Sequence, residues 1–208
     1  MAAITSKVDI CNMALGHLGN LGTVENIDTP SNDKEVTFAL WYDITRQTLL
    51  KNMVPNFALG RQVVARDMNN PPAFGYGYVY AYPTNALKVL GLGNLSEKGD
   101  TNFSVEGNRI YTDSLYDAGM PVRFVKDVTL VNAMSPEFKM LLALYLAEKV
   151  ALPLTQDKAK KKMIQDMLPK EMTSASGINA QENQPVRRSY SRFRAARYSD
   201  PSRDPSKK

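Results

Sequence analysis

The chain contains one histidine, His17, and one cysteine, Cys11. Any mechanism in which a histidine activates a serine or cysteine nucleophile would have to use His17. Cys11 precedes it by six residues, which places the two side chains roughly 240° apart on a helix, so they do not face each other. One histidine and one cysteine are also too few for a zinc site of the usual ligand types. We therefore expect neither nucleophilic catalysis nor a bound metal or other cofactor.

Carboxylates and glycines are the remaining candidates for chemistry. The 21 Asp and Glu residues are spread evenly and form no distinctive motif, so a carboxylate pair for glycoside hydrolysis is not placed by the sequence. Gly91 and Gly93 form a Gly-x-Gly pattern, but it lacks the third glycine and the Lys-Ser pair of phosphate-binding loops. We expect a plain loop there and no enzymatic activity.

The most distinctive residues lie in the C-terminal segment "PVRRSYSRFRAARYSD", residues 185–200, where arginines alternate with aromatic residues. Arginines can neutralise phosphates while aromatic rings stack on bases. Arginines can equally pair with carboxylates while aromatic rings fill pockets of a protein partner. The segment alone does not decide between nucleic acid and protein as its target.

The positive charge of the chain is concentrated in this same region. Residues 185–208 hold eight basic and two acidic residues, a net +6, whereas the rest of the chain holds 18 basic and 19 acidic residues, a net −1. A nearly neutral body with a basic arm attracts anions through that arm and not through a folded basic face. This division argues against a dedicated DNA-binding domain.

Length and composition indicate a globular protein. With 208 residues, 43% of them hydrophobic, the chain can bury a core. It contains no stretch of 18 or more apolar residues and no N-terminal signal-peptide pattern, so we expect neither membrane insertion nor export. A single cysteine excludes an internal disulfide.

Two N-terminal helices are predicted before the strand signals begin. Apolar residues recur with the helical period over residues 6–19, behind Ser6 as N-cap. A long helix is predicted over residues 30–53, with Thr29 as N-cap and a proline in the first turn. A shorter helical piece should open at or just after Pro55.

Strand signals dominate the middle of the chain. Tyrosine-rich and valine-rich alternation, broken by Gly and Pro, begins near residue 70. Residues 102–112 predict a hairpin around a Gly-Asn turn, and "MPVRFVKDV" at residues 120–128 predicts a further strand. We therefore predict a small antiparallel β unit over about residues 70–130, inserted between helical regions.

Helix returns at Ser135, which is predicted to be an N-cap before a proline at the first helical position. Pro153 should end this helix, and Thr155 should cap another that starts near Gln156. The lysine-rich run at residues 158–162 is interpreted as a solvated face, with a functional basic patch as the alternative.

Residues 140–147 are all apolar or aromatic. This run is too short to span a bilayer, and its apolar residues cover too much of the helix circumference for one face to be exposed to solvent. We expect this helix to be buried on nearly all sides, partly by neighbouring subunits because the domain is small. The predicted subunit-packing residues are Phe138, Leu141, Leu142, Leu144 and Tyr145.

These elements predict an α+β fold, mainly a helical bundle with a small inserted antiparallel β unit and an extended C-terminal arm. The predicted organisation is a body over residues 1–170 and a basic arm over residues 171–208, because the sequence after Glu171 is small and polar.

The order of several motifs is more informative than any one of them. They are "VDICNMALGHLGN", "YDITRQTLL", "YAYPTNALKVLGL", "FSVEGNRIYTD" and "SPEFKMLLALYLAEKVALPLT". In this order, over about residues 8–155, the chain resembles the head-to-tail adaptor proteins of short-tailed bacteriophages, including tail tubular protein A and the tail accessory factors. Asn12, Ala14, Leu15 and Gly19 match the opening helix of that family. One departure is Pro55, where the family often has tryptophan, and we interpret it as a packing change.

The resemblance implies a structural role without catalysis. Such adaptors form a ring, usually a dodecamer, below the phage portal protein; a C-terminal extension clasps the portal and the lower face receives the tail nozzle protein. Genomic DNA passes through the lumen. The resemblance thus implies a virion protein of the head–tail junction, made in the cytoplasm of the bacterial host. The expected portal-docking residues are Arg187, Arg188, Tyr190, Arg192, Phe193, Arg194, Arg197 and Tyr198.

Two alternatives from other classes stay open at this point. The arginine and tyrosine residues of the tail fit a nucleic-acid-binding virion protein, whose affinity would fall steeply with salt. A virion-associated peptidoglycan hydrolase is the other alternative, and it would need a carboxylate pair that the sequence does not place.

Overall fold

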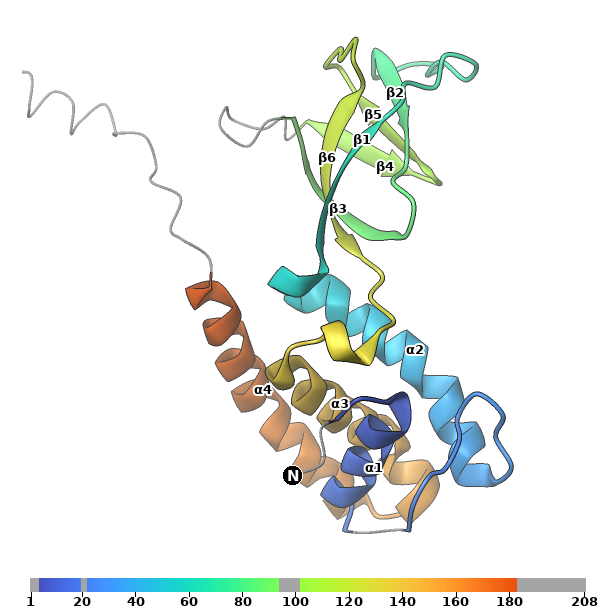
Figure 1. Cartoon of the computed structure of the whole chain (residues 1–208), viewed down its shortest axis with the longest axis vertical. Coiled ribbons are helices and arrows are strands. Elements are labelled where there is room, and N and C mark those ends of the chain that lie inside the picture. Colours follow the sequence, from blue (N-terminus) through green and yellow to red (C-terminus); the bar gives the residue numbers. More distant parts are fainter. Residues whose placement is uncertain (1–3, 20–21, 94–101, 183–208) are drawn as a thin grey trace, which may run out of the picture.

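The computed structural model describes residues 4–19, 22–93 and 102–182. Over these residues the fold is α+β, which confirms the predicted class: a helical body at one end and a β unit of two small antiparallel sheets at the other (Figure 1). The chain leaves the body after α2 (Asp33–Met53), forms the β unit, and returns at α3 (Pro136–Thr155).

Helix α1 (Lys7–His17) begins where the sequence predicts. The Ser6 hydroxyl accepts the Asp9 backbone N–H at 3.1 Å, and the Asp9 carboxylate accepts the Ser6 N–H at 2.9 Å. This reciprocal capping box satisfies donors that a helix start otherwise leaves without partners.

Helix α2 begins at Asp33 with Asn32 as its N-cap, so the predicted start at residue 30 behind Thr29 is wrong. The reason is Glu35, whose carboxylate accepts the backbone N–H of Ser31 at 2.7 Å. The chain before Asn32 therefore wraps around a carboxylate instead of entering the helix.

The helical piece predicted after Pro55 is only the single 3₁₀ turn η1 (Asn56–Ala58). The next residues form strand β1 (Leu59–Val64), which pairs antiparallel with β6 (Met120–Lys126). Strand structure thus begins well before residue 70. Pairing with a distant strand overrides local helical preference here, which sequence propensity does not detect.

The β unit consists of two three-stranded sheets. One has the order β1-β6-β3 and the other β2-β5-β4, with β2 at Tyr78–Ala81, β3 at Ala86–Leu92, β4 at Phe103–Glu106 and β5 at Arg109–Thr112. Beyond β1 the chain crosses to the second sheet, where Arg66 forms an isolated antiparallel β-bridge with Tyr80. The predicted hairpin is confirmed: β4 and β5 pair across a turn in which Gly107 has a φ of +56°. A second core, which includes the buried Tyr80 and Ile110, lies between the sheets.

Helix α3 starts as predicted, with the Ser135 hydroxyl accepting the Phe138 N–H and Pro136 in the first turn. The predicted end at Pro153 is wrong: the helix continues to Thr155 and stops where Gln156 takes a left-handed φ of 54°. Asp157, and not Thr155, caps the following helix α4 (Lys158–Gln181). A proline in the last turn is tolerated because it costs one hydrogen bond near an end that frays in any case.

The apolar helix α3 is buried by its own chain, because α1, α2 and α4 all pack against it. Four of the five predicted subunit-packing residues are fully buried in this single-chain core, so no neighbouring subunit is needed to cover them; they are Phe138, Leu141, Leu142 and Leu144. Tyr145 is half-buried. The prediction that α3 supplies the subunit contact is therefore corrected for these four positions.

Helix α4 extends well past residue 170, so the predicted linker after Glu171 is wrong for its first part. Ala175 is buried in the core, and Asn56 donates from its backbone N–H to the Asn179 side chain at 2.8 Å and from its own amide to the Asn179 carbonyl at 2.7 Å. The sequence does not predict this last part of α4, because its residues are small and polar and only a few of its side chains face the core.

A buried arginine joins the helical body to the β unit. Arg46 of α2 pairs with Asp127, directly after β6, and donates to the Val128 carbonyl at 2.7 Å. The Nε and Nη2 atoms of Arg46 donate to the Asp43 carboxylate at 3.2 Å and 3.0 Å, and the Gln47 side chain donates to the second Asp127 oxygen at 2.9 Å. The Arg46 side chain is buried, so its charge is stable there only because these acceptors surround it.

Candidate docking surfaces

The two residues considered for nucleophilic catalysis lie apart in the structure. Cys11 is fully buried, and burial raises the pKa of its thiol to about 12, whereas His17 is exposed at the end of α1. Within the described residues, no group of three or more His, Cys, Asp and Glu side chains is placed to hold a metal ion. No described helix is long and apolar enough to span a membrane.

Helix α2 has a second apolar face that points away from the core. Its members are spaced four residues apart and are 53%, 62% and 55% exposed: Val36, Leu40 and Ile44. This spacing sets them in one row along the helix. We call this row the α2 surface. Large apolar side chains exposed in a row are typical of a docking face.

A small pocket of about 120 Å³ lies beside the α2 surface, between α2 and α3. Ile44 belongs to both, and Trp41, Leu49 and Tyr145 supply most of the remaining apolar lining. Thr45 also lines the pocket; its side chain is 5% exposed, and among the described residues its hydroxyl has no hydrogen-bond partner. A buried hydroxyl without a partner is costly, so a group entering the pocket would be stabilised by bonding to it.

Helix α4 also exposes a row of apolar side chains, which we call the α4 surface. It comprises Met163, Met167 and Ile178. Part of the lysine-rich run beside it has a structural use: Lys160 donates to the Leu18 carbonyl at 3.1 Å, closing the end of α1, and Lys161 lies 3.6 Å from the Glu148 carboxylate. The remaining lysines, at positions 158 and 162, are exposed.

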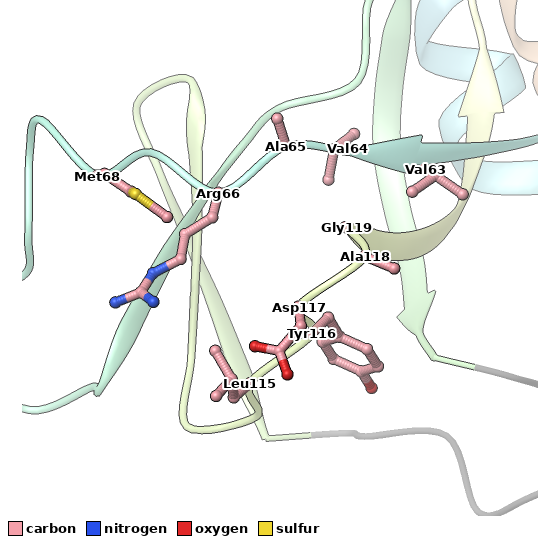
Figure 2. A pocket seen from close by; sticks show the side chains of 10 residues that line it. All are labelled: Val63, Val64, Ala65, Arg66, Met68, Leu115, Tyr116, Asp117, Ala118 and Gly119. Carbon is pink, nitrogen blue, oxygen red and sulfur yellow. The ribbon is translucent and has the colours of Figure 1, made fainter.

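The β unit has an open cleft of about 460 Å³ between residues 63–68 and residues 115–119. Figure 2 shows Arg66 on one side of this cleft and Leu115 and Asp117 on the other. The Arg66 guanidinium lies 4.6 Å from the centre of the Tyr78 ring, a cation–π contact that orients it. Met68, at the rim, is among the most exposed apolar residues.

A second cleft continues from Asn69, next to Met68 in the chain. It lies between the loop of residues 69–76 and the β4–β5 hairpin, and Phe74 on this loop is 90% exposed. The Tyr76 and Tyr111 rings lie 6.3 Å apart within it. The residues that line the two clefts are partly apolar and partly charged. They belong to the β unit, which Figure 1 shows at the end of the molecule away from the helical body.

The eight predicted portal-docking residues, from Arg187 to Tyr198, lie outside the described residues. Of the predicted subunit-packing residues, Tyr145 lines the pocket between α2 and α3. Sequence reasoning missed the α2 and α4 surfaces, although one signal was available: apolar residues four apart at Val36, Leu40 and Ile44, out of phase with the buried row of the same helix.

Comparisons with known proteins add no family assignment. No model of a known protein family matches the chain, and no curated protein matches it at a significant level.

Proposed function

We propose that this protein is a structural head-to-tail adaptor of a phage virion. It forms a ring below the portal, docks to the portal through its C-terminal segment, and offers the opposite end to the tail nozzle protein around the DNA channel. It acts by holding partners in register and not by catalysis. The proposal starts from the ordered motifs over about residues 8–155, which resemble those of phage adaptors.

The observation that supports it best is the separation of exposed apolar side chains onto two parts of one molecule. The helical body carries the α2 and α4 surfaces, while the β unit carries Met68 and Phe74 beside its clefts. A connector needs one surface for its neighbours in the ring and another for the next tail component. Exposed apolar groups of this kind mark interaction sites on water-soluble proteins.

The test is electron microscopy of the purified full chain mixed with the portal assembly of its phage. We expect ring-shaped density on one face of the portal, and we expect a chain that ends at residue 182 to lose that density because the docking arginines and aromatic residues are removed. Absence of a ring with the full chain would falsify the proposal. A ring that forms equally well without residues 183–208 would leave the adaptor role but refute docking through that segment.

A further inference from the structure

The α2 and α4 surfaces lie on different sides of the helical body. Both helices pack against α3, and Figure 1 shows α4 at one side of the body and α2 at the other with α3 between them. Two different apolar surfaces on opposite sides of one chain cannot both be covered by a two-fold contact of one surface with itself. A head-to-tail contact, in which one surface of each copy meets the other surface of the next, covers both.

The charges around the two surfaces are complementary. Residues 25–44, which include the α2 surface, carry five acidic residues and one lysine. Asp28 and Asp43 are paired with Lys7 and Arg46, and Glu35 is buried. Glu25 and Asp33 are the exposed carboxylates of this range outside those pairs. Residues 158–170, which include Met163 and Met167, carry five lysines and one aspartate, a net +4. Exposed carboxylates beside the α2 surface and lysines beside the α4 surface favour the α2–α4 pairing and disfavour α2–α2 or α4–α4 pairing, because each of those would bring like charges together.

The pocket beside the α2 surface also fits a side chain of the α4 surface. It is small enough to take one side chain, its lining is largely apolar, and it contains the Thr45 hydroxyl without a partner. Methionine is unbranched and adapts to irregular gaps, and its thioether sulfur is a weak hydrogen-bond acceptor. The exposed Met163 and Met167 therefore have the shape and chemistry that this pocket accepts.

From these observations we infer that the α2 surface of one copy, with its pocket, receives the α4 surface of the next copy. The contact is head-to-tail, so it repeats until the chain of copies closes. This inference rests on the proposed function, which it deepens by naming the ring contact. It states further that the two surfaces associate without the portal.

The test is analytical ultracentrifugation of the full chain over a concentration series that reaches the millimolar range. We expect the wild type to form species larger than a dimer, and we expect Leu40→Asp and Met167→Asp each to weaken association by roughly tenfold or more, because each places a charge in an apolar contact. An equimolar mixture of the two variants should form pairs and nothing larger. Each variant retains one intact surface, so only one contact per pair can form.

Thr173→Asp is the matched control, because it puts the same charge on another exposed part of α4 and should associate like the wild type. Circular dichroism checks folding, and Leu40→Gln or Met167→Gln replaces a variant that loses helical signal. A wild type that stays monomeric throughout, variants that associate like the wild type, or a mixture that stays monomeric would each overturn the inference. If any of these results occurs but a ring still forms on the portal, the proposed function stands and only the α2–α4 contact is wrong. Failure of the inference and failure of the proposed function are therefore distinguishable.

Discussion

Glu35 is a buried carboxylate whose protonation we expect to affect folding. Its carboxylate accepts the backbone N–H of Ser31, Glu25 and Asn26, and also the Ser31 hydroxyl. These bonds to the charged form lower the pKa of Glu35 from its ordinary value of 4.5 to about 2. Because the folded-state pKa is the lower one, the stabilisation is complete above about pH 4.5 and is lost as the pH falls towards 2.

We therefore expect Glu35→Gln to lower the free energy of unfolding at neutral pH, because a neutral amide oxygen is a weaker acceptor for these donors. The difference from the wild type should shrink as the pH falls from 4.5 towards 2. Urea denaturation at a series of pH values measures both effects. Glu25→Gln, which removes an exposed carboxylate from the same loop, is the control. If the curves for Glu35→Gln and wild type stay parallel across that range, the assignment to Glu35 is wrong.

At the scale of elements, sequence patterns identify most helices and strands but place their ends less well. Ser6 and Ser135 are found as caps because the capping signal lies within a few residues of each helix. The start of α2 differs because a carboxylate inside the helix reorganises the loop before it. Strand β1 differs because its partner β6 lies far along the chain, and no local pattern reports that pairing.

The last part of α4 gives an element-scale prediction. A chain ending at residue 170 should be less stable than one ending at residue 182, because it lacks Ala175 in the core and both hydrogen bonds between Asn56 and Asn179. The expected loss is about 3 kcal/mol from apolar burial and hydrogen bonds together. Chemical denaturation of the two truncated chains measures it. Equal stability would show that residues 171–182 are not part of the folded body.

Asn179→Ala in the longer truncated chain isolates the polar part of that difference. It removes the side-chain acceptor of the Asn56 backbone N–H and leaves Ala175 in place, so about 1 kcal/mol should be lost. Ser174→Ala, at an exposed position of the same helix, should change stability much less.

At the scale of the whole molecule, the class of fold follows from the sequence, whereas the docking surfaces do not. The sequence predicts a helix over residues 30–53, but α2 carries apolar residues on two faces and only packing determines which face meets α3. For the same reason the sequence does not distinguish a subunit contact from a single-chain core at Leu141 and Leu142. Their apolar surroundings in sequence indicate burial but not which molecule provides it.

The C-terminal segment supplies the last whole-molecule prediction, because the adaptor proposal and nucleic-acid binding require different behaviour of the same residues. If Tyr190, Phe193 and Tyr198 anchor the chain by burying their rings in the portal, replacing all three with alanine abolishes docking while the helical content is unchanged. Wild-type docking should then weaken only moderately as salt rises. Binding of the segment to DNA through its arginines would instead fall steeply with salt and survive the loss of the rings in part. Co-sedimentation with portal and with DNA over one salt series measures both, and unchanged docking of the triple variant would favour nucleic acid as the target.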